Sequence, residues 1–172
     1  MGAVIVDACL IITFGNIGEL GVVAGLRAHQ VLIGSRSRGE VTRPPASSAL
    51  ASLITSRSVT VETVDVQNEL EQAALVRFDG RLAFRGRGDA ELLALAVTRG
   101  WIVGSDERAI RSAATAELGS GRVAGTVDFL RWAVAEGRLA KQAAAELVPR
   151  LDVGAGILKE LTATGRTLAE LF

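Results

Sequence analysis

Residues 3–7 read Ala3-Val4-Ile5-Val6-Asp7, and this stretch decides the fold of the 172-residue chain. Its apolar, mostly β-branched residues predict a short buried strand, which is typical of a parallel sheet covered on both faces. The carboxylate at the end of such a strand is costly to bury unless it is paired or bound to a cation. Its simpler role is to cap the helix that follows, and both roles stay open at this point.

The alternation of strands and helices continues along the chain. Further strands are predicted at 29–33, 59–64, 101–104 and 122–124, and helices at 9–26 (broken at Gly15-Asn16), 36–43, 46–57, 66–78, 89–99, 106–118, 126–136, 139–151 and 153–164, with a loop over 79–88. We therefore predict an α/β fold, a three-layer α/β/α sandwich around a central parallel sheet of four to five strands. It forms a single domain over 1–172, with a core of 1–126 and C-terminal helices over 127–172.

Composition limits the function classes. The chain carries 19 basic and 19 acidic residues, and this balance argues against a broadly basic coat for nucleic acid. A local basic groove remains compatible with it. Cysteine and histidine occur once each, as Cys9 and His29, so the chain has no intrachain disulfide and no structural zinc site of its own. Burial trends favour Cys9 as a small buried apolar residue.

The cysteine content, the amino terminus and the lengths of the apolar runs all bear on the cellular compartment. The single cysteine fits a reducing environment. The amino terminus lacks the basic segment of a signal peptide, and no stretch reaches the roughly 20 apolar residues that span a bilayer. We therefore expect a cytoplasmic protein that makes no contact with a membrane.

Acidic residues recur where strands end and helices begin. Asp106 follows the predicted strand at 101–104, as Asp7 follows the strand at 3–6. In a parallel sheet both strand ends lie at one edge, where ligands bind. Like charges gathered there need a positive partner, and a hard cation with oxygen ligands, Mg²⁺ or Mn²⁺, is the partner we expect. Asp89 at a helix start, and Glu40 in another helix, complete the candidate set.

Each acid also has a structural interpretation. Asp89 is a good helix cap, and Glu91, two residues further on, does not share its helix face, so it is kept as an accessory residue. Glu107 fits a solvent-facing first turn better than a ligand, which favours Asp106. Glu40 has arginines nearby in its own helix, a pattern typical of a solvated face.

Arginines lie close in sequence to these acids. The planar guanidinium suits phosphate oxygens, although ordinary surface arginines explain each single position equally well. The candidates for contact with the phosphates of a substrate are Arg36, Arg38, Arg87, Arg108 and Arg111.

The acids and their surroundings resemble the PIN-domain family, over residues 3–130 closely and over the tail loosely. The resemblance is carried by Val4-Ile5-Val6-Asp7-Ala8-Cys9, by Val31-Leu32-Ile33 followed by Glu40-Val41, by Gly88-Asp89-Ala90-Glu91-Leu92-Leu93-Ala94-Leu95-Ala96, by Ser105-Asp106-Glu107-Arg108 with Arg111 and Ala114, and by Gly125-Thr126. The tail is similar to a branch with extra C-terminal helices. Two departures are Ala8-Cys9, where members commonly place a polar residue, and Asp89, where this branch often has Glu.

The resemblance implies a metal-dependent endoribonuclease, with RNA as substrate. Many relatives are toxins of a toxin–antitoxin pair, so it also implies a cognate antitoxin protein and a homodimer. Asp7, Asp89 and Asp106 would hold one or two Mg²⁺ or Mn²⁺ ions, and Glu40 would complete the catalytic set. Glu91 would replace Asp89 if the shorter side chain fell short, and Ser105 or Thr126 would orient the phosphate through its hydroxyl.

Three alternatives stay open. A dinucleotide-binding protein is suggested by Gly15, Gly18 and Gly21, but these lie too far beyond the first strand for the usual fingerprint. A phosphoryl-acceptor domain usually needs a lysine beside its acids, and both lysines of this chain lie in the tail. The third alternative is a catalytically inactive PIN-like module that binds a partner, with apolar helices at 18–26 and 46–54 as its interface.

Overall fold

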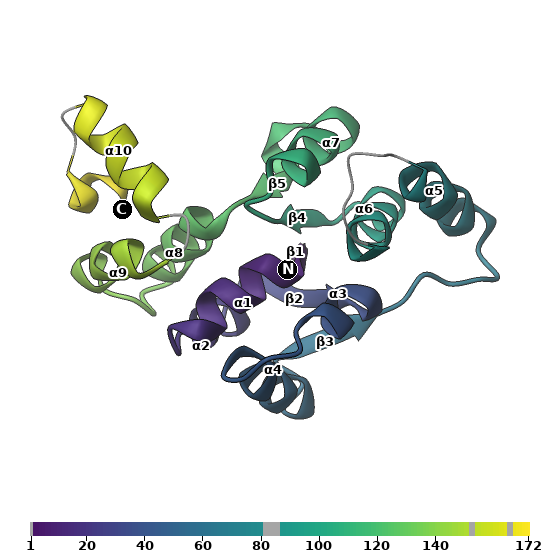
Figure 1. Ribbon diagram of the computed structural model, residues 1–172, viewed down its shortest axis with the longest axis horizontal. Helices are drawn as coiled ribbons and strands as arrows, with labels where there is room; N and C mark the ends of the chain where they lie inside the picture. The colour runs from purple at the N-terminus through teal and green to yellow at the C-terminus, as the bar shows by residue number, and fades with distance from the viewer. Residues whose placement is uncertain (1, 81–86, 152–153, 165–166) are drawn as a thin grey trace.

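The chain forms a five-stranded, fully parallel sheet between layers of helices (Figure 1). The computed structural model describes residues 2–80, 87–151, 154–164 and 167–172. The strands are β1 (Gly2–Val6), β2 (His29–Gly34), β3 (Val59–Glu62), β4 (Ile102–Gly104) and β5 (Val123–Ala124). Their order across the sheet is β3-β2-β1-β4-β5. The α/β class and the number of strands predicted from the sequence are confirmed.

The helices follow the predicted alternation. They are α1 (Ala8–Asn16), α2 (Leu20–Ala24), α3 (Ser35–Glu40), α4 (Ala46–Thr55), α5 (Glu69–Asp79), α6 (Arg87–Arg99), α7 (Arg108–Leu118), α8 (Thr126–Ala135), α9 (Lys141–Leu147) and α10 (Gly154–Thr164), with 3-10 turns η1 (Ser120–Arg122), η2 (Val148–Arg150) and η3 (Leu168–Leu171). The loop expected at 79–88 lies mostly outside the described residues.

Several helix starts differ from the sequence prediction by one to three residues; α7, for example, begins at Arg108 rather than at 106. Helix α5 begins three residues later than expected, because the Asn68 side chain accepts hydrogen bonds from the backbone N–H groups of Leu70 and Glu71 and so caps the helix there. Helix α6 begins before Asp89 and carries it within the first turn, where an acid is favoured by the helix dipole.

Alternate residues of the central strand feed two separate cores. Val4 and Val6 pack on one face of the sheet with residues of α1, α2, α4, α8 and α9. Ile5, between them, packs on the other face with residues of α5, α6 and α7. This division follows from the period of two along a strand. It gives three layers, as predicted.

The C-terminal helices extend the first of these cores. Phe129 and Leu130 of α8, and Ala144 of α9, are buried against it. Several apolar residues considered for a partner interface, such as Leu20, Val23 and Leu50, likewise point into this core. Within the described residues, no helix combines the length and the apolar character that crossing a membrane requires.

Candidate active site

The candidate site lies where the order of the strands reverses. From β1 the chain moves outward to β2 and β3 on one side, whereas β4 and β5 extend the sheet on the other side. The carboxyl ends of β1 and β4 therefore open at the switch point, the usual position for a ligand in this architecture. The backbone N–H of Asp7 donates to the carbonyl oxygen of Gly104 at 2.9 Å, which fixes the two strand ends side by side.

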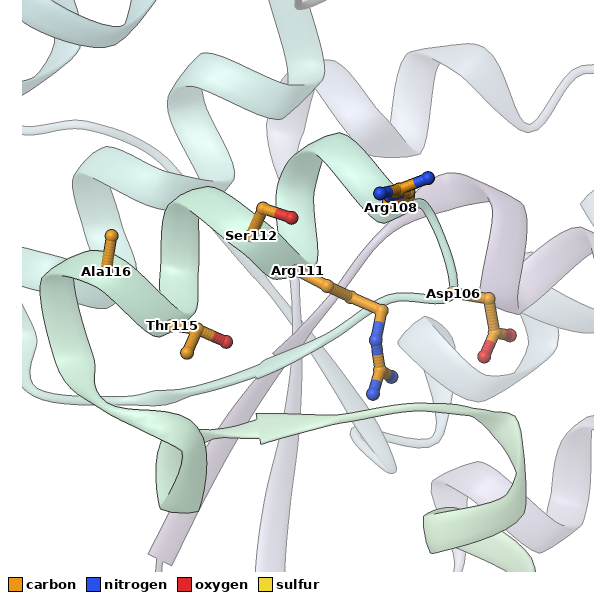
Figure 2. A pocket seen from close by; sticks show the side chains of 6 residues that line it. All are labelled: Asp106, Arg108, Arg111, Ser112, Thr115 and Ala116. Atoms are coloured by element: carbon orange, nitrogen blue, oxygen red, sulfur yellow. The ribbon is translucent and has the colours of Figure 1, made fainter.

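Asp106 turns from this switch point toward α8. Its carboxylate accepts hydrogen bonds from the backbone N–H of Thr126, at 2.9 Å, and from the Thr126 hydroxyl. The carboxylate thus satisfies an orphan donor in the first turn of α8, where the helix dipole favours a negative charge. Figure 2 shows Asp106 on the segment that leads from β4 into α7. This geometry supports a positioning role, although Asp106 still lies close enough for its charge to contribute to the raised pKa of Asp7.

Asp7 is buried at the end of β1 and is held from two directions. Its side chain is the cap of α1, accepting from the backbone N–H of Cys9 at 3.4 Å. The hydroxyl of Ser105 donates to its second oxygen at 2.9 Å. Burial raises the pKa of Asp7, because the hydrogen bonds it receives do not fully replace the water it has lost. Both roles that the sequence left open, the cap and the buried charge, occur in the same carboxylate.

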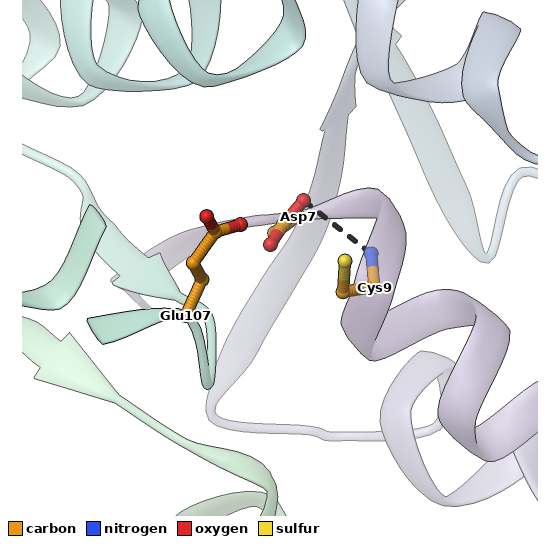
Figure 3. Close-up of side chains that lie close together, drawn as sticks. All are labelled: Asp7, Cys9 and Glu107. Atoms are coloured by element: carbon orange, nitrogen blue, oxygen red, sulfur yellow. Dashed lines mark hydrogen bonds between the residues drawn. The ribbon is translucent and has the colours of Figure 1, made fainter. Parts of the chain in front are cut away.

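Glu107 approaches Asp7, while Cys9 lies on the other side of it (Figure 3). One oxygen from each carboxylate and the Cys9 sulfur lie within 4.8 Å of one another. Glu107 is half-buried, and its backbone N–H donates to the Ser105 hydroxyl, so Ser105 links it to Asp7. The structure therefore groups Glu107 with Asp7 and points Asp106 away, the reverse of the ranking expected from the sequence.

Cys9 is exposed, so the prediction of a buried apolar residue is wrong. It lies on the first turn of α1, which opens toward the switch point rather than into the core. The pKa of the thiol is raised to about 11. Partial desolvation is the largest cause, followed by the negative charges of Asp7, Glu107, Asp89 and Glu40 in that order. One thiol thus lies in the field of four carboxylates that come from four separate places in the chain.

Glu40 reaches this cluster from the end of α3. Its carboxylate accepts a hydrogen bond from the backbone N–H of Gly88 in the first turn of α6. Desolvation raises the pKa of Glu40, and the charges of Asp7 and Glu107 contribute to the rise. Gly88 has no room for a side chain, since a Cβ there would lie 2.7 Å from the Glu40 carboxylate. Asp89, the next residue, is buried beside this contact.

Glu91 binds the start of α3 rather than the acid cluster. It is buried, and its carboxylate accepts hydrogen bonds from the Ser35 hydroxyl at 2.8 Å and from the Arg36 backbone N–H at 2.7 Å. Both donors belong to the first turn of α3, so Glu91 caps that helix from α6. This contact fixes α3, and with it Glu40, against α6. It supports Asp89 rather than Glu91 as the acid that faces the cluster.

The two hydroxyls expected to orient a phosphate face inward instead. Ser105 and Thr126 are completely buried, and their hydroxyl groups donate to Asp7 and Asp106 respectively. A buried hydroxyl that already donates to a carboxylate is not available to a phosphate. Their role in this fold is to hold the acids in place.

The candidate arginines fall into two groups. Arg108 and Arg111 line a pocket on α7 that includes Asp106 (Figure 2). Arg38 lines another pocket, between α3 and α4, and Arg36 uses its backbone N–H to cap α3 with Glu91. The side chain of Arg87 lies outside the described residues.

The environment of Cys9 gives a direct prediction for its chemistry. A pKa of about 11 instead of 9.0 lowers the thiolate fraction near neutral pH about 100-fold, and the thiolate is the reactive form. We therefore expect iodoacetamide to modify Cys9 slowly in the metal-free protein, and the Glu107→Gln variant, which removes one of the surrounding charges, to react faster at the same pH. Mass spectrometry of the labelled protein measures both rates. Equal rates in the two proteins would show that the acids do not act on the thiol.

Comparisons with known proteins add no assignment. No family model matches the chain, and no curated protein or solved structure matches it.

Proposed function

We propose that this protein is a metal-dependent endoribonuclease of the PIN-domain type. The observation that carries the proposal is the convergence of carboxylates at the switch point of the sheet. Asp7 and Glu107 arrive from the ends of β1 and β4, and Asp89 and Glu40 arrive from α6 and α3. These elements are distant in the chain, so their meeting is a property of the fold rather than of one acidic stretch.

The donor set fits a divalent cation. Carboxylate oxygens are the ligands that Mg²⁺ and Mn²⁺ prefer, and Asp7, Glu107 and Asp89 are the residues we expect to hold the ion, with Glu40 beside them. Burial raises the pKa of Asp7 and of Glu40, and neighbouring carboxylates add to each rise, so a cation bound among them would stabilise their charged forms. When bound, the cation would supply an activated water and stabilise charge on the leaving oxygen.

The chain's own residues prepare this site in three ways. The Ser105 hydroxyl donates to the Asp7 carboxylate and accepts from the backbone N–H of Glu107, and so orients both residues. Glu91 fixes α3, so that Glu40 stays against α6. Asp106 fixes the start of α8, and the carboxylate is held away from the ligand position by Thr126. The RNA strand is the proposed substrate, and a cognate antitoxin and a homodimer remain proposals that rest on the family resemblance.

RNA cleavage in Mn²⁺ and in Mg²⁺, each against an EDTA control, tests the proposal. We expect wild type to cleave single-stranded RNA only with metal, and Glu107→Gln to lose more activity than Asp106→Asn, since Glu107 lies with Asp7 whereas Asp106 binds Thr126. Full RNA cleavage by both variants, at equal rates, would contradict the assignment of the active site to this cluster.

Calorimetric titration with Mn²⁺ distinguishes the nuclease from the alternative of a catalytically inactive binding module. A nuclease site should bind Mn²⁺ in the wild-type protein and bind it more weakly in Glu107→Gln. A protein that neither binds Mn²⁺ nor cleaves RNA would be the inactive module instead.

A further inference from the structure

A pocket on α7 adjoins the acid cluster but is not part of it. Its volume is about 570 Å³, within the range of sites that take small ligands. Figure 2 shows it running from Asp106 along the helix. It is lined by Asp106, Arg108, Arg111, Ser112, Thr115 and Ala116.

Apart from the Asp106 carboxylate, which precedes the helix, the polar lining comes from one face of α7. Positions 108, 111, 112 and 115 are spaced by three, four and seven residues, which places their side chains along a single stripe. The stripe carries two guanidinium groups followed by two hydroxyl groups, all of them hydrogen-bond donors and none of them acidic. Such a row suits a ligand that offers negatively charged oxygens at repeated intervals.

The two arginines of this stripe keep donors available for a ligand. Arg111 donates one hydrogen bond, from Nη1 to the carbonyl oxygen of Ser105 at 3.2 Å, and this contact directs the guanidinium toward the switch point. Neither Arg108 nor Arg111 forms an ion pair with any carboxylate in the described part of the chain. In contrast, Arg77 and Arg99 are paired with acids.

Gly125 leaves room for two of the side chains that line the pocket, Arg111 and Asp106. A Cβ at this position would lie 2.5 Å from the Arg111 guanidinium and 2.7 Å from the Asp106 carboxylate. The absence of a side chain leaves space for the Arg111 guanidinium and the Asp106 carboxylate at the start of α8. This end of the pocket therefore lies at Ser105, whose hydroxyl binds Asp7 of the cluster.

We propose that this α7 pocket binds the phosphates of the single RNA strand that flank the bond to be cut. The inference rests on the proposed function and adds the path of the substrate. The acid cluster itself repels a phosphate chain, and the protein has no net positive charge to offset this. Arg108 and Arg111 supply the attraction locally, through planar donor groups that match phosphate oxygens. Arg36 and Arg38, on the side of α3, lie outside this path.

Binding of a fluorescein-labelled, unstructured RNA in EDTA tests the pocket without cleavage. Anisotropy is measured over a series of KCl concentrations for wild type, Arg108→Gln and the double variant Arg108→Gln/Arg111→Gln. Each phosphate contact on a single strand contributes about 0.7 to the slope of log K against log salt. We expect the slope to fall by about 0.7 in the single variant and about 1.4 in the double variant, with affinity about tenfold lower in the latter.

Arg27→Gln is the matched control, because Arg27 is an exposed arginine next to β2 at the opposite end of the sheet. Arg108→Lys keeps the charge and should keep the slope while losing affinity. Thermal denaturation confirms that the variants fold. The pocket assignment is overturned if wild type binds no RNA in EDTA, or if the double variant behaves like Arg27→Gln. If wild type binds RNA but never cleaves it, and the double variant loses binding, then the proposed nuclease activity is contradicted while the proposed RNA-binding pocket is supported.

Discussion

Asp7→Asn is expected to abolish metal-dependent RNA cleavage and, in the absence of metal, to make the protein more stable. Both effects follow from one carboxylate that is 2% exposed and that has no cation beside it among the described residues. Asparagine keeps the oxygen that accepts from the Cys9 backbone N–H, and its amide can donate to the Ser105 hydroxyl oxygen. The substitution thus removes the buried charge while preserving the contacts around it.

The gain in stability expected for Asp7→Asn without metal depends on pH. Relief of the desolvation cost is worth about 1–3 kcal/mol at neutral pH, roughly 2–4 °C in Tm for each kcal/mol in a chain of this length. Because burial raises the folded-state pKa of Asp7 above its usual 3.8, wild-type stability falls as the pH rises through that folded-state pKa. The advantage of the variant is therefore present at neutral pH and vanishes below 3.8, where both side chains are neutral.

With Mn²⁺ present, we expect wild type to have a higher Tm than Asp7→Asn, the reverse of the order without metal. Mn²⁺ stabilises a protein that binds it by mass action, so wild type gains Tm on titration and Asp7→Asn gains little. Loss of a direct ligand should lower cleavage by at least about 100-fold, the upper range for loss of a residue that only supports a ligand. Thermal scans in EDTA and in Mn²⁺, together with cleavage rates, measure all of this.

Asp128→Asn serves as the control for Asp7→Asn. Asp128 is also an acid at a helix start, but it is partly exposed and accepts a hydrogen bond from the Gly125 backbone N–H. Its removal should not stabilise the protein, since it relieves no buried charge and weakens a cap. A lower Tm for Asp7→Asn than for wild type in EDTA at neutral pH would contradict the account of a strained acid cluster.

The sequence was sufficient to predict the sheet and the edge at which Asp7 and the 105–107 segment meet. Short apolar runs identified β1 and β4, and parallel strands necessarily place Asp7 and the 105–107 segment at one edge. The cluster that results is a consequence of topology. The same reasoning predicted the helix between Glu40 and β2, and the helix that carries Asp89.

The sequence was not sufficient to rank neighbouring residues. Asp106 and Glu107 are adjacent in the chain, and which of them faces Asp7 depends on how the turn after β4 is held. That turn is fixed by Ser105, whose hydroxyl binds Asp7, and by Thr126, which binds Asp106 from twenty residues away. Neither contact has a local signal. Cys9 was misplaced for a related reason, because burial trends for cysteine carry no information on the direction in which the first turn of α1 faces.

A partly exposed arginine, Arg99, pairs with the buried Glu71 and holds α6 in position, and no sequence pattern predicted this ion pair. Arg99, at the end of α6, donates to Glu71 through Nε at 2.8 Å and through Nη2 at 3.1 Å, and to Glu62 through Nη1 at 2.7 Å. Glu71 also accepts from the backbone N–H of Asp65 at 2.8 Å. The network joins α6 to the end of β3 and to the start of α5, so it fixes the helix whose other end carries Asp89.

Arg99→Ala is expected to cause the largest loss of stability of any substitution considered. The Glu71 side chain is 5% exposed, so removal of Arg99 leaves a buried carboxylate without its cation, at a cost of about 3–5 kcal/mol. Arg77→Ala is the matched control: it removes one ion pair, to Glu117, and one cation–π contact, with Phe78, from a half-exposed arginine, and should cost about 1 kcal/mol. Chemical denaturation at neutral pH measures both.

The pH dependence and a second substitution separate this charge effect from simple loss of packing. Hydrogen bonds from Arg99 lower the folded-state pKa of Glu71 below its usual 4.5, so the stabilisation is present above 4.5 and is lost as the pH falls through the folded-state pKa. The gap between wild type and Arg99→Ala should therefore narrow in acid. Adding Glu71→Gln to Arg99→Ala removes the stranded charge and should recover part of the loss, because an amide costs less to bury than a carboxylate. If the double variant were less stable than Arg99→Ala and the gap did not change with pH, then the contact of the Arg99 guanidinium with the Trp101 ring, rather than the ion pair, would hold α6 in place.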